Sequence, residues 1–556
     1  MLDDLDLSII TDEGTRECVV RLLDLIETLS ADLRASQAEN QRLRDENNRL
    51  KGEQGKPTVK PGTKSTATNH SSEPERRQSR PREKGGKVEQ VQIDREQVLQ
   101  VDPAVLPPDA QFKGYEEVVV QDVVVRTDNV LFRKEKFYSP AQRETYLAEL
   151  PPGYQGEFGP GIRALVIIFA FACQMTEPKI LGWFRQVGVQ ISAGQISNLL
   201  IKDQQQFHGE KDAVYQAGLA SSPWQHLDDT ATRVNGQNQH CHVVNNPLHT
   251  TYLTTRSKDR LSVIDVLRNG PPRRFRLGSE ALRYLETAGV SGITRQQLSH
   301  LPQDWDLDEA TMQRLLEEYL PNLGTQTRKW ILDAAAVAAY HAQREWPVVR
   351  LLVCDDAPQF TSVTEELALC WVHEGRHYKK LFPYVAQHQQ LLEDFLGHFW
   401  DFYRELLAYR QQPTPGERQR LEKRFDALFA TKTSYWALDE RIGLTRAKKT
   451  SLLMVLAHPE TPLHNNSAEL DARQRVRKRK ISFGPRVADG TKAWDTFMSL
   501  AGTTRKLGVN FYHYIQDRIS GANQIPQLAS IIEERAKELN LGASWELLSP
   551  YPDLLS

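Results

Sequence analysis

The spacing of hydrophobic positions changes several times along the chain, and each change predicts a different kind of element. Between about residues 20 and 51, seam residues recur at alternating steps of four and three, which predicts one long helix with a heptad seam. Asparagines at two a-type positions favour a parallel dimeric coiled coil, and packing within the same chain is the alternative. The seam consists of Leu22, Ile26, Leu29, Leu33, Ser36, Asn40, Leu43, Asn47 and Leu50.

The next two segments are not helical in pattern. Residues 52–90 are dominated by Gly, Pro, Ser, Thr, Lys and Arg, which predicts a basic flexible linker because such a composition buries too little apolar surface to order itself. Its cluster Arg76–Lys87 is either solvated or in contact with DNA phosphates. Residues 91–150 then predict a small β-rich module from three β-branched runs. These runs are Val118–Val120, Val123–Val125 and Val130–Phe132.

Helical periodicity returns over residues 151–218. A buried helix is expected from Gly161, followed by two shorter helices that are separated at Gly188, the second with Ser192 as its N-cap. This pattern is compatible with a DNA-binding helix-turn-helix and also with an ordinary helical bundle.

A sheet is predicted next. Trp224–Val234 carries Asp228 and Asp229, and two further strands, HCHVVNN and HTTYLTTR, precede a helix over Asp259–Arg268. After an amphipathic helical stretch over 271–347, the apolar run VVRLLVCDDAPQF predicts a central parallel strand that ends in Asp355 and Asp356. Carboxylates at the carboxyl end of such a strand lie where open α/β sheets place their sites.

The stretch His458–Gly484 combines a lone acid with a strongly basic helix. Asn466 is the predicted N-cap and Glu469 occupies the capping-box position three residues later. A carboxylate ahead of a cationic stripe indicates metal-assisted chemistry on nucleic acid. The alternative is a helix whose first turn is acidic because the macrodipole favours it. The residues expected to contact DNA phosphates are Arg473, Arg477, Lys478, Arg479 and Lys480.

Composition bounds the class of protein. The 556 residues predict three or four domains, and the net charge of −2 says nothing about a polyanionic partner. Five scattered cysteines exclude a disulfide framework. The N-terminus lacks the basic region of a signal peptide, and the longest apolar run, Ala164–Cys173, is too short to span a bilayer, so a cytoplasmic protein is expected. No phosphate-binding GxxxxGK[ST] loop occurs, so nothing supports an ATP-driven mechanism.

Four motifs in order, HLDDT, LLVCDDAPQF, LALCWVHEGRHYKKL and PLHNNSAELDARQRVRKRKISFG, resemble the transposases of the insertion-sequence sixty-six family, which are bacterial DDE transposases (TnpC type). The resemblance runs from about residue 158 to 520 and implies an RNase H-like catalytic core interrupted by helical insertions. It implies Asp228, Asp355 and Glu469 as catalytic, metal-binding acids. Asp229 and Asp356 stay as fallback candidates, because neighbouring strand residues face opposite sides.

The resemblance also implies the cofactor and the partners. Two Mg²⁺ ions are expected, with Mn²⁺ as a substitute. The expected partners are the terminal inverted repeats of a mobile element, target DNA, a further copy of the chain and small accessory proteins of the same element, in a bacterial, nucleoid-associated setting.

The chain departs from that family in two places. Residues 91–148 contain no cysteine, so the family's zinc-binding module is not transferable. The helical segment over 271–347 is longer than the usual link between the first two acids. Cys370, His373 and His377 have zinc-site spacing, but no fourth ligand is evident and core packing is expected for them, as for Trp371 and His226.

The predicted fold class is therefore mixed α+β and α/β, with an RNase H-like core, helical insertions, an N-terminal coiled-coil helix and a small β-rich module. The predicted function is Mg²⁺-dependent cleavage of mobile-element ends and strand transfer into target DNA; the alternative is a catalytically inactive, transposase-derived regulator that binds DNA. The expected segments are a helix or coiled coil over 1–51, a linker over 52–90, a β-rich module over 91–150, a helical segment over 151–218, the first part of the core over 219–360 with its insertion at about 271–347, a helical insertion over 361–457, the end of the core over 458–520 and a C-terminal tail over 521–556.

Overall fold

The N-terminal helix is the first element of the computed structural model, which describes residues 10–50, 91–154, 156–270 and 272–546. Helix α1 covers Glu13–Leu50 and confirms the predicted long helix. One face packs against the helical lobe described below, where the Glu27 carboxylate accepts hydrogen bonds from the backbone amides of Tyr384 at 2.8 Å and Val385 at 2.7 Å. The seam leucines are not on that face, since Leu29 and Leu33 are 59% and 60% exposed. The predicted linker over 52–90 lies outside the described residues.

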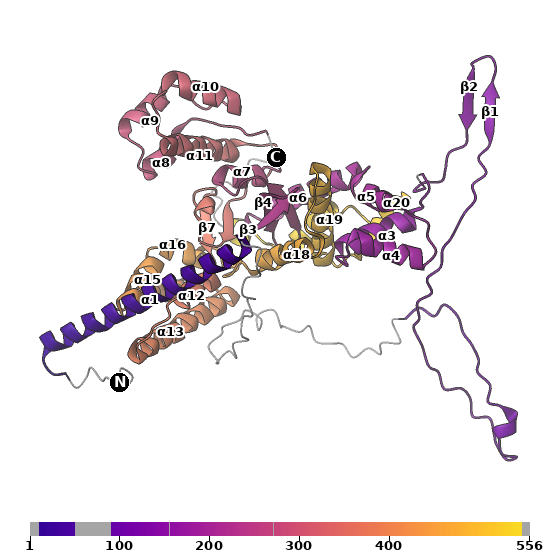
Figure 1. Cartoon of the computed structure of the whole chain (residues 1–556), viewed down its shortest axis with the longest axis horizontal. Helices are drawn as coiled ribbons and strands as arrows, with labels where there is room; N and C mark the ends of the chain where they lie inside the picture. Colours follow the sequence, from indigo (N-terminus) through magenta and orange to yellow (C-terminus); the bar gives the residue numbers. More distant parts are fainter. Residues whose placement is uncertain (1–9, 51–90, 155, 271, 547–556) are drawn as a thin grey trace.

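The prediction of a β-rich module over 91–150 is wrong in its strands. The three valine-rich runs form no strand in the described chain, and Val123 and Val124 are more than 80% exposed. The only regular elements there are a short turn of 3₁₀-helix, η2 (Pro103–Val105), and an antiparallel hairpin of β1 (Lys136–Ser139) and β2 (Glu144–Leu147) that projects away from the rest of the chain (Figure 1). β-Branched residues favour a strand only where a partner strand and a buried face are available, and these runs have neither within the described residues.

The helices after the hairpin agree with the sequence. They are α3 (Pro160–Phe171), α4 (Glu177–Gln186), α5 (Ala193–Ile201) and α6 (Gln205–Ala220). The turn between α4 and α5 contains Gly188 at φ +85°, a left-handed conformation that glycine adopts without strain. The Ser192 hydroxyl accepts from the amide of Gln195 at 3.1 Å, which confirms it as the N-cap of α5.

A five-stranded mixed sheet forms the centre of the chain. Its strands are β3 (Trp224–Val234), β4 (Gln237–Asn245), β5 (Thr250–Thr255), β6 (Leu351–Cys354) and β7 (Glu366–Leu369), in the order β5-β4-β3-β6-β7. Strands β3, β4 and β5 form an antiparallel meander, whereas β6 and β7 extend the sheet in parallel from β3. Strand β4 alone therefore runs against the other four. Strand β7 corrects the expectation that residues from 361 onward are entirely helical: its Leu and Ala residues carry little strand propensity, and pairing with β6 decides its conformation.

Two helical insertions interrupt the sheet. Between β5 and β6 lie α7 (Arg260–Leu267), α8 (Ser279–Thr287), α9 (Gly292–Ser299), α10 (Glu309–Tyr319) and α11 (Thr325–Ala342). The second insertion, the helical lobe, lies beyond β7 and contains α12 (Trp371–Tyr378), α13 (Ala386–Gln411), α14 (Pro415–Leu428), α15 (Trp436–Arg446), α16 (Lys449–Leu452) and α17 (Met454–Ala457). Trp371 is fully buried among the aromatic rings of this lobe, so packing is confirmed as its role.

The two faces of the sheet are covered by different helices. Leu227 and Leu352 pack in a core with α7 and α11, whereas Trp224 and Val353 belong to a separate cluster on the opposite face. That opposite face carries α18 (Asn466–Ser482) and α19 (Ala488–Lys506). Because side chains alternate along a strand, His226 and Asp228 point to the face of Trp224 and α18.

The C-terminal segment is part of the core and not a tail. It contains α20 (Phe511–Ser520), α21 (Leu528–Leu539) and α22 (Ala543–Glu546). The ring of Trp545 stacks on His458 with centroids 3.6 Å apart, and the indole of Trp224 donates to the carbonyl of Leu541 at 2.8 Å. None of the helices described is long and apolar enough to cross a membrane.

Candidate active site

Two of the predicted acids lie on neighbouring parallel strands. The register of β3 and β6 pairs His226 with Val353, so two residues further along each strand direction Asp228 comes level with Asp355. Asp228 follows the alternation of β3 that points toward α18, and Asp355 is the first residue after β6. The two neighbouring strands therefore bring together carboxylates that are far apart in the sequence.

The fallback acids have other partners. The Asp229 carboxylate accepts from Gln359 Nε2 at 2.8 Å and lies 3.9 Å from Lys258 Nζ, on the α7 side of the sheet. Asp356 Oδ2 lies 2.5 Å from Lys448 Nζ. These pairings favour Asp228 over Asp229 and Asp355 over Asp356, because among the described residues neither Asp228 nor Asp355 forms an ion pair with a lysine or arginine.

The acids act on one another electrostatically. Burial, together with the negative charges of Asp355 and Glu469, raises the pKa of Asp228 to about 7. Burial also raises the pKa of Asp355, although nearby His373 opposes the shift. Like charges gathered in a partly desolvated site destabilise their ionised forms, and a bound divalent cation removes that penalty. The donor set of hard carboxylate oxygens fits Mg²⁺.

Helix α18 brings the third acid, and its N-terminus differs from the predicted capping box. The N-cap is Asn465, not Asn466, and its side chain makes no capping hydrogen bond. Instead its Nδ2 donates to the carbonyl of Leu227 at 2.8 Å, and its Oδ1 accepts from Nδ1 of His226 at 2.9 Å. The side chain of the observed N-cap residue thus joins the start of α18 to β3, next to Asp228.

Glu469 lies beside two arginine side chains and one histidine ring in this structure. Its carboxylate lies 3.3 Å from Arg376 Nη2, 3.6 Å from Arg473 Nη2 and 3.5 Å from His373 Nε2. Its ligand atom lies within 4.8 Å of those of both Cys370 and His373, a grouping that the three predicted acids do not form among the described residues. Glu469 thus lies between two sets of candidate ligands.

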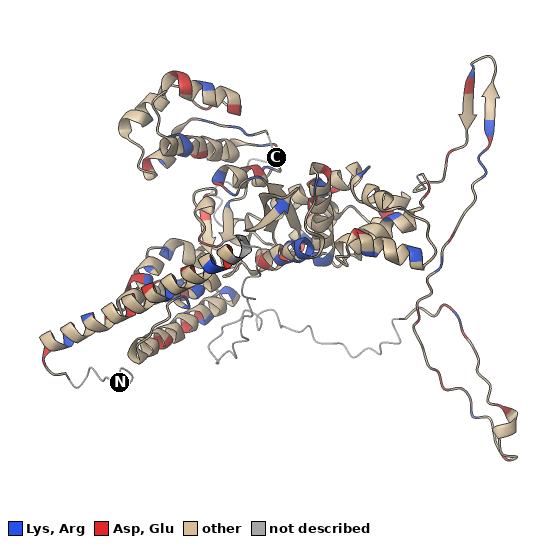
Figure 2. Cartoon of the chain, viewed as in Figure 1, with Lys and Arg blue, Asp and Glu red and all other residues tan. Residues whose placement is uncertain are grey.

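The predicted cationic stripe divides into three parts. Arg473, Arg477 and Lys480 are exposed, as expected, and their spacing from Glu469 places them on its side of α18. Figure 2 shows lysines and arginines along this helix. Arg479 donates to the carbonyl of Ala231 in β3. Lys478 corrects the prediction: only 3% of it is exposed.

The position of Lys478 excludes contact with a phosphate. Its Nζ lies 5.2 Å and 5.1 Å from the ring centroids of Phe171 and Trp494, and burial lowers its pKa to about 8. A one-residue offset on a helix turns the side chain by 100°, so five consecutive or near-consecutive basic residues cannot share one face.

Sequence reasoning missed two residues of the site, Arg376 and Asn465. Arg376 follows His373 by three residues, so both lie on one face of α12, and that spacing was an available signal. Nothing in the sequence indicated that Asn465 bonds to β3, because that contact is made only in the tertiary structure.

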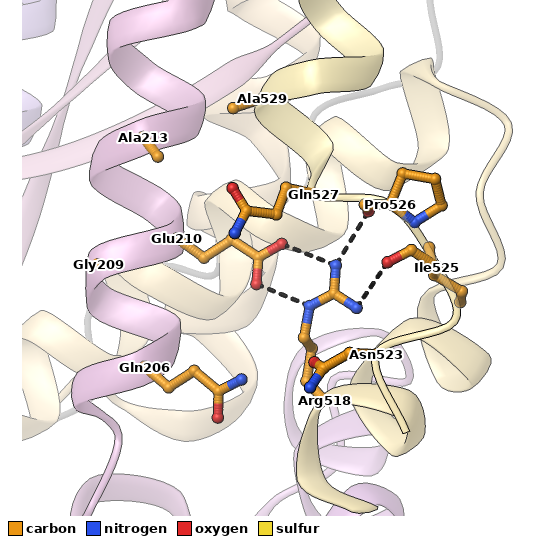
Figure 3. Close-up of a pocket in the computed structure, with 10 residues that line it drawn as sticks. All are labelled: Gln206, Gly209, Glu210, Ala213, Arg518, Asn523, Ile525, Pro526, Gln527 and Ala529. Carbon is orange, nitrogen blue, oxygen red and sulfur yellow. Dashed lines mark hydrogen bonds and ion pairs between the residues drawn. The ribbon is translucent and has the colours of Figure 1, made fainter. Parts of the chain in front are cut away.

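A cavity of about 410 Å³ lies elsewhere, between α6 and the α20–α21 connection. Arg518 projects across it, and its guanidinium is paired with Glu210 at 3.0 Å and bonded to the carbonyls of Ile525 and Pro526 at 2.9 Å each (Figure 3). A guanidinium with its donors so occupied is structural, and none of the predicted site residues lines this cavity.

Comparison with known proteins yields a relative without an assigned activity. The uncharacterized protein y4jO of Sinorhizobium fredii is 33% identical over 330 residues, which cover 58% of this chain and 99% of that protein. No protein-family model matches the chain, and no solved structure matches it.

The raised pKa of Asp228 predicts that Asp228→Asn increases the free energy of unfolding, by an amount that depends on pH. The folded chain holds the Asp228 proton up to about pH 7, whereas the unfolded chain releases it near pH 3.8, so the stabilisation by the protonated form is complete below about pH 4 and lost as the pH rises through 7. With divalent ions chelated, D228N should equal the wild type near pH 4 and exceed its free energy of unfolding by roughly 2–4 kcal/mol near pH 8.

Chemical denaturation at both pH values measures this difference. Asp229→Asn is the matched control, because that carboxylate is already bonded to Gln359, and it should show no such pH-dependent gain. A D228N variant that is no more stable than the wild type near pH 8 would contradict the electrostatic description of the site.

Proposed function

We propose that this chain, which belongs to the same family as the uncharacterized protein y4jO, is a DDE transposase that cuts the ends of a mobile DNA element and joins them to target DNA. The observation that supports the proposal is electrostatic: besides burial, the negative charges of Asp355 and Glu469, which come from distant parts of the sequence, raise the pKa of Asp228. Partly buried, mutually repelling acids on and beside the central strands of a sheet indicate a metal-dependent catalytic site more than a structural one.

The sheet supports an RNase H-like core as part of this proposal. Five strands in the order β5-β4-β3-β6-β7, with β4 alone reversed, agree with the arrangement expected of such a core. The first acid lies on the central strand β3, the second follows its parallel neighbour β6, and the third comes from α18, which packs on the same face.

Each group of residues has a separate task in the proposed reaction. Asp228, Asp355 and Glu469 would hold magnesium, which when bound stabilises the charge on the attacking and leaving oxygens of an in-line phosphodiester cleavage. Arg473, Arg477 and Lys480 bind DNA phosphates along the exposed side of α18 and fix the position of the DNA without reading its bases. Arg376 and Arg473 position the Glu469 carboxylate beside that path, at 3.3 Å and 3.6 Å.

Recognition of the element ends is assigned to a different part of the chain. The pair α4 and α5, with its glycine turn and its Ser192 cap, is the candidate helix-turn-helix. In such a motif the second helix reads base edges in the major groove, so α5 is the proposed reading helix. The alternative function, a regulator that binds the same ends without cutting them, uses these same elements.

Asp355→Asn separates the two functions. On labelled duplexes that carry the ends of the element in Mg²⁺, the variant should still shift the DNA but lose nicking and joining by at least about 10³-fold, since it removes a charged ligand without changing the shape of the side chain. A gel shift and a strand-cleavage assay on the same samples measure both properties.

Asp356→Asn is the matched control, one residue further on and paired with Lys448, and it should retain most of the activity. Cleavage by D355N at the wild-type rate would contradict the proposal. Binding without cleavage by the wild type, in Mg²⁺ or Mn²⁺, would support the regulator instead.

Helix α1 is proposed to join two copies of the chain. Leu22, Leu29, Leu33 and Leu43 are each more than half exposed, although they form the predicted heptad seam, while Leu23 is buried against the helical lobe. A seam that remains apolar and exposed after the other face has packed is what a coiled-coil partner covers.

Replacing Leu29 and Leu33 together with Lys tests the coiled coil. The variant should have half the mass of the wild type in light scattering, because two like-charged side chains at seam positions prevent association. The control replaces Arg21 and Arg42, which lie outside the seam, with Gln, and it should leave the mass unchanged. A wild type that is already monomeric at micromolar concentration would contradict the proposed dimer.

A further inference from the structure

A second group of candidate metal ligands shares Glu469 with the proposed acids and adds Cys370 and His373, which have no part in the reaction above. Cys370 lies between the end of β7 and the start of α12, His373 lies in the first turn of α12, and Glu469 reaches them from α18. Their ligand atoms are all within 4.8 Å of one another. A thiol, an imidazole and a carboxylate at this spacing are the donor set of three-ligand zinc sites that keep a fourth position open.

The surroundings of Cys370 favour a sulfur ligand. Burial raises the pKa of the Cys370 thiol to about 11, and the backbone amides of Asn465, which is 3.2 Å from Sγ, His373 and Val372 oppose this shift by donating to the sulfur. The thiol itself is 1% exposed, so it is protected from solvent on the side away from His373 and Glu469. Amide donors around a buried sulfur orient it and stabilise its negative charge.

The ring of His373 is held in the state that binds metal. Arg376 Nη1 lies 2.9 Å from Nε2, and because a guanidinium can only donate, Nε2 is the unprotonated nitrogen. That same nitrogen is 3.5 Å from the Glu469 carboxylate. The other nitrogen, Nδ1, is buried and has no hydrogen-bond partner in the described structure.

Arg376 occupies the position of a cation. Its guanidinium contacts both His373 and Glu469, at 2.9 Å and 3.3 Å, and its side chain is 43% exposed, so it can move into solvent at small cost. A positive charge that bridges an imidazole and a carboxylate makes the contacts that a metal ion would make with the same two ligands.

We propose that Cys370, His373 and Glu469 form a binding site for a thiophilic divalent ion of the zinc class, and that Arg376 takes the place of this ion when the site is free. The site is distinct from the proposed magnesium site in its soft ligands, yet it shares Glu469 with it. Occupation draws the shared carboxylate toward Cys370 and His373 and away from Asp228 and Asp355. On the basis of the proposed function, binding of zinc at this site inhibits magnesium-dependent DNA cleavage.

Cobalt titration of the reduced, metal-free full-length chain tests the site without DNA. One equivalent of Co²⁺ should produce thiolate-to-cobalt charge-transfer absorption in the near ultraviolet, and Zn²⁺ should displace it. Cys370→Ser and His373→Gln should each abolish the band, whereas Cys173→Ser, which replaces an exposed cysteine, should retain it. Circular dichroism of each variant confirms that it is folded.

A pair of arginine variants tests the role of Arg376. Arg376→Gln should bind Co²⁺ about tenfold more tightly, because a competing cation has been removed. Arg473 lies 3.6 Å from Glu469 but does not bridge it to His373, so Arg473→Gln should change the affinity less. If R376Q and the wild type bind Co²⁺ with equal affinity, the proposal that the metal ion displaces Arg376 is overturned.

Two results would overturn the site itself: no charge-transfer band in the wild type, or a band that survives both Cys370→Ser and His373→Gln. Neither depends on DNA cleavage, so a failure of the proposed function remains distinguishable. If the wild type cleaves DNA in Mg²⁺, added Zn²⁺ should inhibit it at least tenfold at one equivalent. Cleavage that Zn²⁺ leaves unchanged would overturn the sharing of Glu469.

Discussion

The hydrogen bonds of Asn465 hold the candidate site together. One buried side chain connects the start of α18 to the carbonyl of Leu227 and the ring of His226, and its backbone amide reaches Cys370 at the end of β7. The residue is fully buried, so losing one partner would leave a desolvated polar group at a cost of about 1–3 kcal/mol. Two strands and one helix are thereby fixed relative to one another within a few residues of all three acids.

A second anchor further along α18 completes this constraint. The buried Asp471 accepts from Asn245 at 2.8 Å and from Thr250 at 2.7 Å, and Arg505 balances its charge at 3.0 Å. Glu469 lies between the two anchors, so its position over the sheet is set by bonds on both sides of it. The site needs this rigidity, because the acids repel one another and would separate if the helix were free to move. Arginine and histidine side chains on the α12 side offset part of that repulsion, which explains how one carboxylate comes to face two ligand sets.

Much of the sheet could be predicted from the sequence, because local signals and tertiary pairing agree there. Strand β3 has the predicted bounds, and β4 and β5 follow turns that contain Asn, Gly and Pro. Strand β7 and the valine runs near residue 120 show the reverse case. There the presence or absence of a partner strand decides the backbone conformation, and the strand propensity of the residues does not. The acids could be named from motifs, but three facts could not: that Asn465 bonds across to β3, that Lys478 turns inward under Trp494, and that Arg376 meets Glu469. Each depends on which helix packs beside which strand, and the spacing of residues within one segment does not reveal that packing.

The central claim is that Asp228, Asp355 and Glu469 together hold the divalent ions of the proposed reaction. Anomalous diffraction from crystals of the full-length chain soaked in Mn²⁺ tests it most directly. We expect manganese between Asp228 and Asp355, at about 2.1–2.3 Å from their carboxylate oxygens, with Glu469 turned toward it. Manganese that binds elsewhere, or a site in which Asp229 and Asp356 replace these two acids, would contradict it.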